Sequence, residues 1–205
     1  NIPALVLKGA ALVERVYPDI GLRPMVDLDV LVHAVDVPAA CDLLAALGYK
    51  APHSEPAAGL TLAFENELLL RKSQPLSLAL ELHWSLFDSP HHQHRLSLDW
   101  FWQTATPIRV GLAPAYILGP EAELLHLCGH LALHHRGQGL LWQHDIAAVI
   151  VRRQNTIDWD LVVARAVQCD LVLSLKTLLP RIAEDWAAPV PARVLNQLTA
   201  LQPSA

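Results

Sequence analysis

The chain has 205 residues, 53% hydrophobic and 17% charged, a composition that supports a buried core and excludes an intrinsically disordered protein. Its net charge of −5 lacks the basic surplus of a general nucleic-acid-binding protein, so a nucleic-acid partner is disfavoured. No apolar run approaches the ~18 residues of a membrane-spanning helix, and no secretory signal pattern is visible, so we expect no membrane association.

The cysteine pattern indicates a reducing compartment. The chain has three cysteines, an odd number, which are far apart and show no CxxC spacing: Cys41, Cys128 and Cys169. Such cysteines are typical of reduced thiols rather than of a disulfide framework, so we expect a cytoplasmic protein. The chain opens directly in a strand-like run over residues 2–7, and we expect a further segment to precede it.

The first predicted elements form a strand, a glycine and a helix. The apolar run 4–8 predicts a strand that Gly9 ends, and residues 10–17 have helical spacing up to Pro18. A helix start of this kind presents backbone N–H groups that favour a phosphate, and Lys8 adds positive charge beside it. Many α/β proteins have such a junction for packing alone, which is the alternative interpretation.

The run 22–32 contains two aspartates one residue apart, Asp27 and Asp29, among apolar and β-branched residues. It predicts a buried strand, on which residues i and i+2 point to the same face roughly 6–7 Å apart. Neighbouring carboxylates repel unless a cation lies between them, so the pair indicates a divalent-metal site; two solvated acids are the alternative. Pro24 keeps Arg23 extended, which places Arg23 near the proposed metal unless it is an ordinary loop arginine.

Alternating strands and helices continue to residue 118. In the strand expected over 76–84, Ala79, Glu81 and His83 share one face, and a carboxylate on a central strand is rarely buried unless it is paired or metal-bound. The histidines of the polar loop 88–95, His91, His92 and His94, are interpreted as solvated. The other elements expected here are a helix over 37–48, strands over 60–65, 67–72, 108–110 and 115–118, and a short amphipathic element over 99–102.

From Pro120 the pattern becomes entirely helical. We therefore predict an α+β protein with two parts, an α/β domain over 1–118 and a helical C-terminal subdomain over 119–205. The expected helices span 121–136, 140–153, 158–169, 171–186, where Pro180 is expected to kink or break the helix, and 192–201.

One stripe of the predicted helix 121–136 is polar and contains Glu123, His126, His130 and His134. Histidines at i and i+4 can share a metal, although no HExxH motif is present. We favour an interpretation in which these histidines line an active-site cleft, with Asp145 contributing from the next helix. A hydrogen-bonded or solvated polar face is the alternative.

Together these motifs resemble the DNA polymerase β-like nucleotidyltransferase superfamily. Its plan is a glycine at a strand-to-helix turn, an Asp-x-Asp strand and one acid on a later strand, here Lys8-Gly9-Ala10, Asp27-Leu28-Asp29 and Glu81. The Arg-Pro-Met-x-Asp-x-Asp block within 22–32 is similar to a bacterial family of uncharacterised nucleotidyltransferases. That likeness covers about residues 5–160 and includes Glu81-Leu-His-Trp84, His130-Leu-Ala-Leu-His134 and Trp142-x-x-Asp145. Two departures from the superfamily are Gly9-Ala10 in place of Gly-Gly or Gly-Ser, and a longer spacing from Gly9 to Asp27.

The resemblance implies a nucleotidyltransferase-like mixed sheet flanked by helices and an enzyme that moves NMP, most simply AMP from ATP, to a small-molecule or protein acceptor. It implies that Asp27 and Asp29 hold two Mg²⁺ ions, or Mn²⁺ in vitro, with Glu81 on the ion nearer the acceptor. Lys8, Gly9, Ala10 and Arg23 would bind the nucleotide phosphates, and pyrophosphate would leave. Two alternatives remain: a catalytically silent binding or antitoxin-like module of the same fold, and a metal hydrolase that uses His126, His130 and His134.

Overall fold

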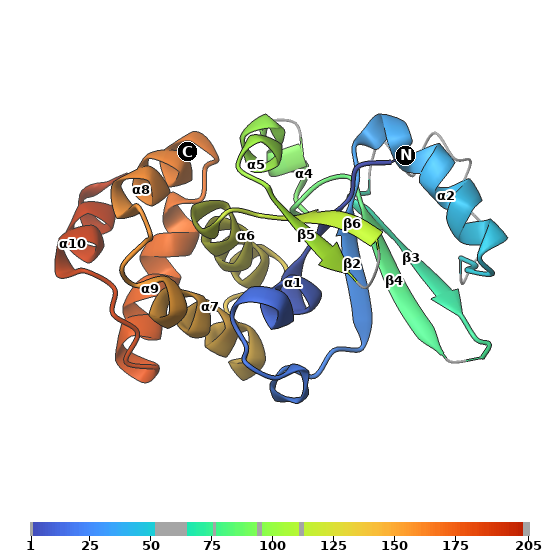
Figure 1. Cartoon of the computed structure of the whole chain (residues 1–205). Helices are drawn as coiled ribbons and strands as arrows, with labels where there is room; N and C mark the ends of the chain where they lie inside the picture. The colour runs from blue at the N-terminus through green and yellow to red at the C-terminus, as the bar shows by residue number, and fades with distance from the viewer. Residues whose placement is uncertain (1, 52–64, 76, 94–95, 111–112, 203–205) are drawn as a thin grey trace. The chain divides into compact units, whose positions relative to one another are not determined.

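Figure 1 shows the computed structural model of the chain, which describes residues 2–51, 65–75, 77–93, 96–110 and 113–202. Its residues group into two compact units. The first unit comprises residues 1–90 and 105–118, and the second comprises 91–104 and 119–205. The strand expected over 60–65 and the loop histidine His94 lie outside the described residues, except for residue 65 itself.

The first unit is built on a mixed sheet, as the sequence predicts. Its described strands lie in the order β3-β4-β2-β1-β6-β5, with the pairs β2–β4 and β1–β6 parallel and the other pairs antiparallel. The strands are β1 Leu5–Val6, β2 Asp27–Leu31, β3 Glu67–Lys72, β4 Leu78–His83, β5 Thr106–Val110 and β6 Ala113–Ile117.

Two helices of the first unit, α1 (Lys8–Arg15) and α2 (Val37–Ala46), bury the apolar side chains of the sheet. Val37 and Ala40 of α2 belong to one core cluster with Leu80 and Leu82 of β4. Leu28 of β2 packs against the same cluster. Because side chains alternate along a strand, Asp27 and Asp29 point to the face opposite Leu28. The acids therefore lie on the face of the sheet that α2 does not cover.

The second unit is entirely helical among its described residues. Helix α6 lies at its centre and contacts α7, α8 and α9. The helices are α4 Pro90–Gln93, α5 Asp99–Gln103, α6 Pro120–Leu133, α7 Leu140–Arg153, α8 Trp159–Gln168, α9 Val172–Asp185 and α10 Ala192–Ala200.

Three helical features differ from the sequence-based expectation. The loop expected around His91 contains the short helix α4, and His91 pairs with Asp170. Helix α9 is not broken at Pro180, which lies on an exposed side of the helix. In helix α6, Glu123, His126 and His130 of the polar stripe are buried, whereas His134 is exposed, so the solvated alternative applies to His134 alone.

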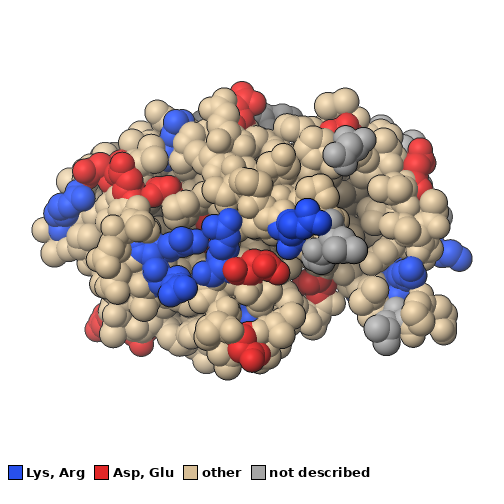
Figure 2. Space-filling model, in the orientation of Figure 1, with Lys and Arg blue, Asp and Glu red and all other residues tan. Residues whose placement is uncertain are grey.

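Among the described residues, the structure contains no helix that is long and apolar enough to cross a membrane. On the face shown in Figure 2, several Lys and Arg side chains lie next to one another with an acidic side chain beside them, and most of the surface carries neither charge.

Candidate functional site

The parallel pairing of β2 with β4 brings two of the predicted carboxylates together. Asp29 is the direct Cα partner of Glu81, whereas Asp27 is opposite Ala79. Both Asp27 and Glu81 retain partial exposure, while Asp29 is buried at 5%. The sheet register, rather than a loop, therefore fixes the distance between the carboxylates of β2 and β4.

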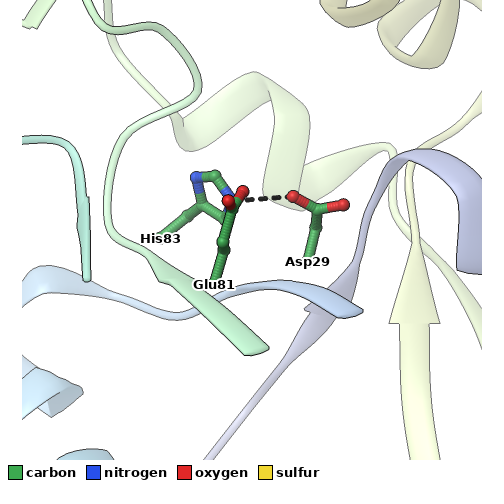
Figure 3. Close-up of side chains that lie close together, drawn as sticks. All are labelled: Asp29, Glu81 and His83. Atoms are coloured by element: carbon green, nitrogen blue, oxygen red, sulfur yellow. Dashed lines mark hydrogen bonds and ion pairs between the residues drawn. The ribbon is translucent and has the colours of Figure 1, made fainter. Parts of the chain in front are cut away.

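Two cationic side chains contact this carboxylate pair. Lys8 Nζ lies 2.7 Å from Asp29 Oδ1 and 3.5 Å from Glu81 Oε2. His83 Nε2 lies 3.0 Å from the same Asp29 oxygen and 3.6 Å from Glu81 Oε2. Figure 3 shows Asp29, Glu81 and His83 converging from their two strands, with the hydrogen bond between His83 and Asp29 drawn as a dashed line.

A third acid, Glu67 of β3, extends the cluster to the neighbouring strand. Its Oε2 lies 3.0 Å from His83 Nδ1, and the two residues are Cα partners in the antiparallel pair β3–β4. The sequence analysis did not assign Glu67 to the site. Its position depends on the register between β3 and β4, and a strand-initiating glutamate gives no local signal of that register.

These contacts set the protonation states of the buried groups. Burial alone would raise the pKa of Asp29, but the hydrogen bond from His83 and the charge of Lys8 outweigh it and lower the pKa to about 2. Burial alone would lower the pKa of His83, but the hydrogen bond to Asp29 and the nearby carboxylates of Glu67 and Glu81 raise it to about 10. The raised pKa favours the imidazolium form of His83 at neutral pH, with Nε2 hydrogen-bonded to Asp29 and Nδ1 3.0 Å from Glu67 Oε2.

Asp27 experiences the opposite electrostatic environment. Its pKa is raised by partial burial and then by the negative charges of Asp29 and Glu81, which outweigh the opposing influence of Lys8 and Arg23. The two neighbouring carboxylates disfavour the ionised form of Asp27, and a bound cation would stabilise that form. The electrostatics of Asp27 therefore support a cation site on this face of the sheet.

The start of α1 lies beside the carboxylates, where the sequence predicts phosphate binding. Lys8, the first residue of α1, has a positive φ of 48°, and within the described chain no side chain caps this helix N-terminus. A Cβ atom added to Gly9 would lie 2.8 Å from Met25 Cγ and 3.3 Å from the Arg23 guanidinium. Gly9 thus has a packing role, because it allows Met25 and Arg23 to lie against the helix start.

The residues present fit a divalent cation. Ligand atoms of Asp29, Glu81 and His83 lie within 4.8 Å of one another, and within the described ranges no other set of three potential ligands was found. Carboxylate oxygens are the hard ligands that Mg²⁺ and Mn²⁺ prefer. The hard ligands of this group are the oxygens of Asp29 and Glu81, with Asp27 on the same face of β2.

The other predicted site residues belong to the helical unit, where the histidines lie close to one another. His130 Nε2 lies 3.1 Å from His135 Nε2, and the His130 ring stacks on that of His134. The His126 ring lies 6.2 Å from that of His130, centroid to centroid, and Asp145 of α7 is fully buried. The predicted role of these residues in lining a cleft stays a prediction.

Two comparisons with known proteins gave a match. The model of a family described as uncharacterised nucleotidyltransferase matches residues 1–187. Among solved structures, the chain is similar to an antigenic nucleotidyltransferase-like protein from Paracoccidioides brasiliensis. The two chains are 17% identical over 86% of this chain and 85% of that one, with a TM-score of 0.44. No curated protein matches the chain.

Proposed function

The chain belongs to the family of uncharacterised nucleotidyltransferases, and on this premise we propose that it is a metal-dependent enzyme that transfers NMP, most simply AMP from ATP, to a small-molecule or protein acceptor. An acceptor hydroxyl oxygen attacks the α-phosphorus of the nucleotide. The bond from that phosphorus to the β-phosphate oxygen breaks, and pyrophosphate leaves. The net charge of −5 favours such an acceptor over a nucleic acid.

One observation carries this proposal: Asp29 and Glu81 are in register across the parallel strands β2 and β4, with Asp27 beside them. Three carboxylates concentrated on one face of a sheet repel one another in the absence of cations. We assign Asp27, Asp29 and Glu81 as the residues that hold Mg²⁺, two ions in the arrangement that the resemblance implies. When bound, the ions supply charge stabilisation for the attacking and leaving oxygens.

The remaining residues of the site have separate roles in this proposal. Glu81 retains a side-chain exposure of 22% and accepts the proton of the acceptor hydroxyl. The N-terminus of α1, at Gly9 and Ala10, binds the β- and γ-phosphates through backbone N–H groups. Arg23 lies close enough to Asp27 for its charge to oppose the rise in the pKa of that carboxyl group. It adds positive charge beside the phosphates.

The experiment uses the full chain with each α-³²P-labelled NTP in turn, Mg²⁺ and a cell extract as the source of acceptor. We expect label to be transferred by the wild type and lost in Asp27→Ala/Asp29→Ala. The matched control is Glu14→Ala/Asp42→Ala, which removes two exposed carboxylates of α1 and α2 and should transfer label normally.

The same experiment separates the two main interpretations. Transfer that persists in the Asp27/Asp29 variant would contradict the assignment of the carboxylates. Tight binding of NTP by the wild type without any transfer would instead support the catalytically silent module. The labelled NTP that supports transfer identifies the nucleotide base.

A further inference from the structure

The ammonium group of Lys8 occupies a central position among the proposed metal ligands. Its Nζ lies 2.7 Å from Asp29 Oδ1 and 3.5 Å from Glu81 Oε2, and its side chain is only 13% exposed. A cation shared by these two oxygens would lie at nearly the same place. At the 2.0–2.1 Å that Mg²⁺ requires, the ion and the ammonium group cannot both keep these contacts.

Asp29 Oδ1 is already contacted by two donors, Lys8 Nζ and His83 Nε2. A carboxylate oxygen has two lone-pair sites, so an ion that binds this oxygen must displace one of the donors. His83 is held on its other side by Glu67 and is 2% exposed, whereas Lys8 ends a flexible four-carbon stem. Lys8 is therefore the group that moves.

We propose that Lys8 is a built-in competitor of the divalent ion, which must displace the ammonium group from Asp29 and Glu81 before the site is loaded. This inference rests on the proposed function, since it takes these carboxylates as the metal ligands. The displaced ammonium group is then available to the triphosphate that arrives with the ion. Metal alone binds weakly, and loading the site is coupled to the arrival of the nucleotide.

The test measures Mn²⁺ affinity of the full chain without nucleotide, by calorimetry or by the electron paramagnetic resonance signal of free Mn²⁺. The variant is Lys8→Met, which keeps a side chain of similar length. Methionine, like lysine, is unbranched at Cβ, so the positive φ at this position is equally strained in both proteins. We expect its dissociation constant for Mn²⁺ to fall by about tenfold, because a positive charge next to the ion is removed. The control is Lys50→Met, which removes an exposed charge from the same unit and should leave the affinity unchanged.

Two further measurements tie the effect to this site. Adding Asp29→Asn to Lys8→Met should abolish the gained affinity. Without metal, Lys8→Met should melt at a lower temperature than the wild type, because the carboxylates lose a counter-charge, and Mn²⁺ should raise its melting temperature more than that of the wild type. Lys8→Gln replaces Lys8→Met if the methionine variant does not fold.

A measurement on the wild type needs no substitution at all. Mn²⁺ should increase the rate at which an amine-reactive reagent labels Lys8, relative to Lys50, Lys72 and Lys176 in the same sample. Equal Mn²⁺ affinity in the wild type and Lys8→Met, with no change in Lys8 labelling, would overturn the inference and leave the metal site standing. A lack of Mn²⁺ binding in the wild type and every variant would overturn the metal site itself.

Discussion

Asp29 of β2 and Glu81 of β4 are direct partners across a parallel strand pair. Their spacing is set by backbone hydrogen bonds in the middle of the sheet. A site built in this way is rigid, and its carboxylates cannot separate to relieve their repulsion. Counter-charges must therefore come to them, and in this protein Lys8 and His83 both contact Asp29.

The two aspartates of β2 should differ sharply in their effect on stability. Asp29→Asn leaves two buried cations without their shared partner and should lower the free energy of unfolding by about 3 kcal/mol. Asp27→Asn removes a carboxylate that Asp29 and Glu81 repel, and should leave the metal-free stability within about 0.5 kcal/mol of the wild type or slightly higher.

Urea denaturation of both variants in the presence of a chelator checks this prediction. Nucleotide transfer should fall in both variants, because both residues are assigned to the metal. Equal destabilisation by the two substitutions would show that Asp27 is as firmly paired as Asp29.

The alternation of side chains along β2 was predictable, because it follows from the pattern of residues 27–31 and from strand geometry. The sequence analysis also predicted the presence of Glu81 on the same kind of face. The links between strands were not predictable. That Asp29 meets Glu81, and that His83 meets Glu67, depends on the sheet order β3-β4-β2 and on registers that no single strand encodes.

Gly9 was interpreted as a phosphate-binding residue, and the structure adds a steric role that can be tested separately. In Gly9→Ala, the new methyl group would lie within 2.8 Å of Met25 Cγ, so the gain of about 1 kcal/mol in helix propensity should be cancelled. In the Met25→Ala background the same substitution should stabilise the protein by up to about 1 kcal/mol. A double-mutant cycle of unfolding free energies measures the coupling.

A coupling energy near zero would contradict the steric role of Gly9. Transfer activity gives an independent result. If the glycine also lets phosphate approach the backbone, Gly9→Ala/Met25→Ala should fold well and still bind nucleotide poorly.

Cys128 of α6 predicts a pH dependence that is independent of the candidate site. It is fully buried, and burial raises the pKa of its thiol to about 12. The unfolded chain has a cysteine pKa of about 8.5, so the folded state binds more protons above that pH. The contribution of Cys128 to stability is present below about pH 8.5 and is lost as the pH rises towards 12, by up to about 1.4 kcal/mol per unit.

The measurement compares the wild type with Cys128→Ala in urea, under reducing conditions, at pH 7.5 and pH 10. The stability advantage of the wild type should shrink at the higher pH. An advantage that is the same at both pH values would mean that the thiol is not protected by the fold.

Pro180 lies inside α9 on an exposed side of the helix, where it cannot donate a backbone hydrogen bond. Pro180→Ala should therefore raise the free energy of unfolding by about 2 kcal/mol. This value is the penalty of about 3 kcal/mol for proline in a helix interior, reduced by up to about 1 kcal/mol because proline also lowers the conformational entropy of the unfolded chain. Thermal melting checks the prediction, with Glu184→Ala on the same helix as the control. A lower melting temperature in Pro180→Ala would show that α9 is adapted to its proline.

Lys8 and His83 pair with Asp29 in the metal-free protein. Folding therefore does not have to wait for the proposed ion to bind. Lys8 and His83 compensate part of the negative charge of the cluster within the polypeptide, so a newly synthesised chain can complete its sheet before it meets an ion. A zinc finger, by contrast, stays unfolded until metal arrives. Under the proposed function, scarcity of the ion would therefore abolish activity without lowering the abundance of the protein, and activity would return on resupply without new synthesis.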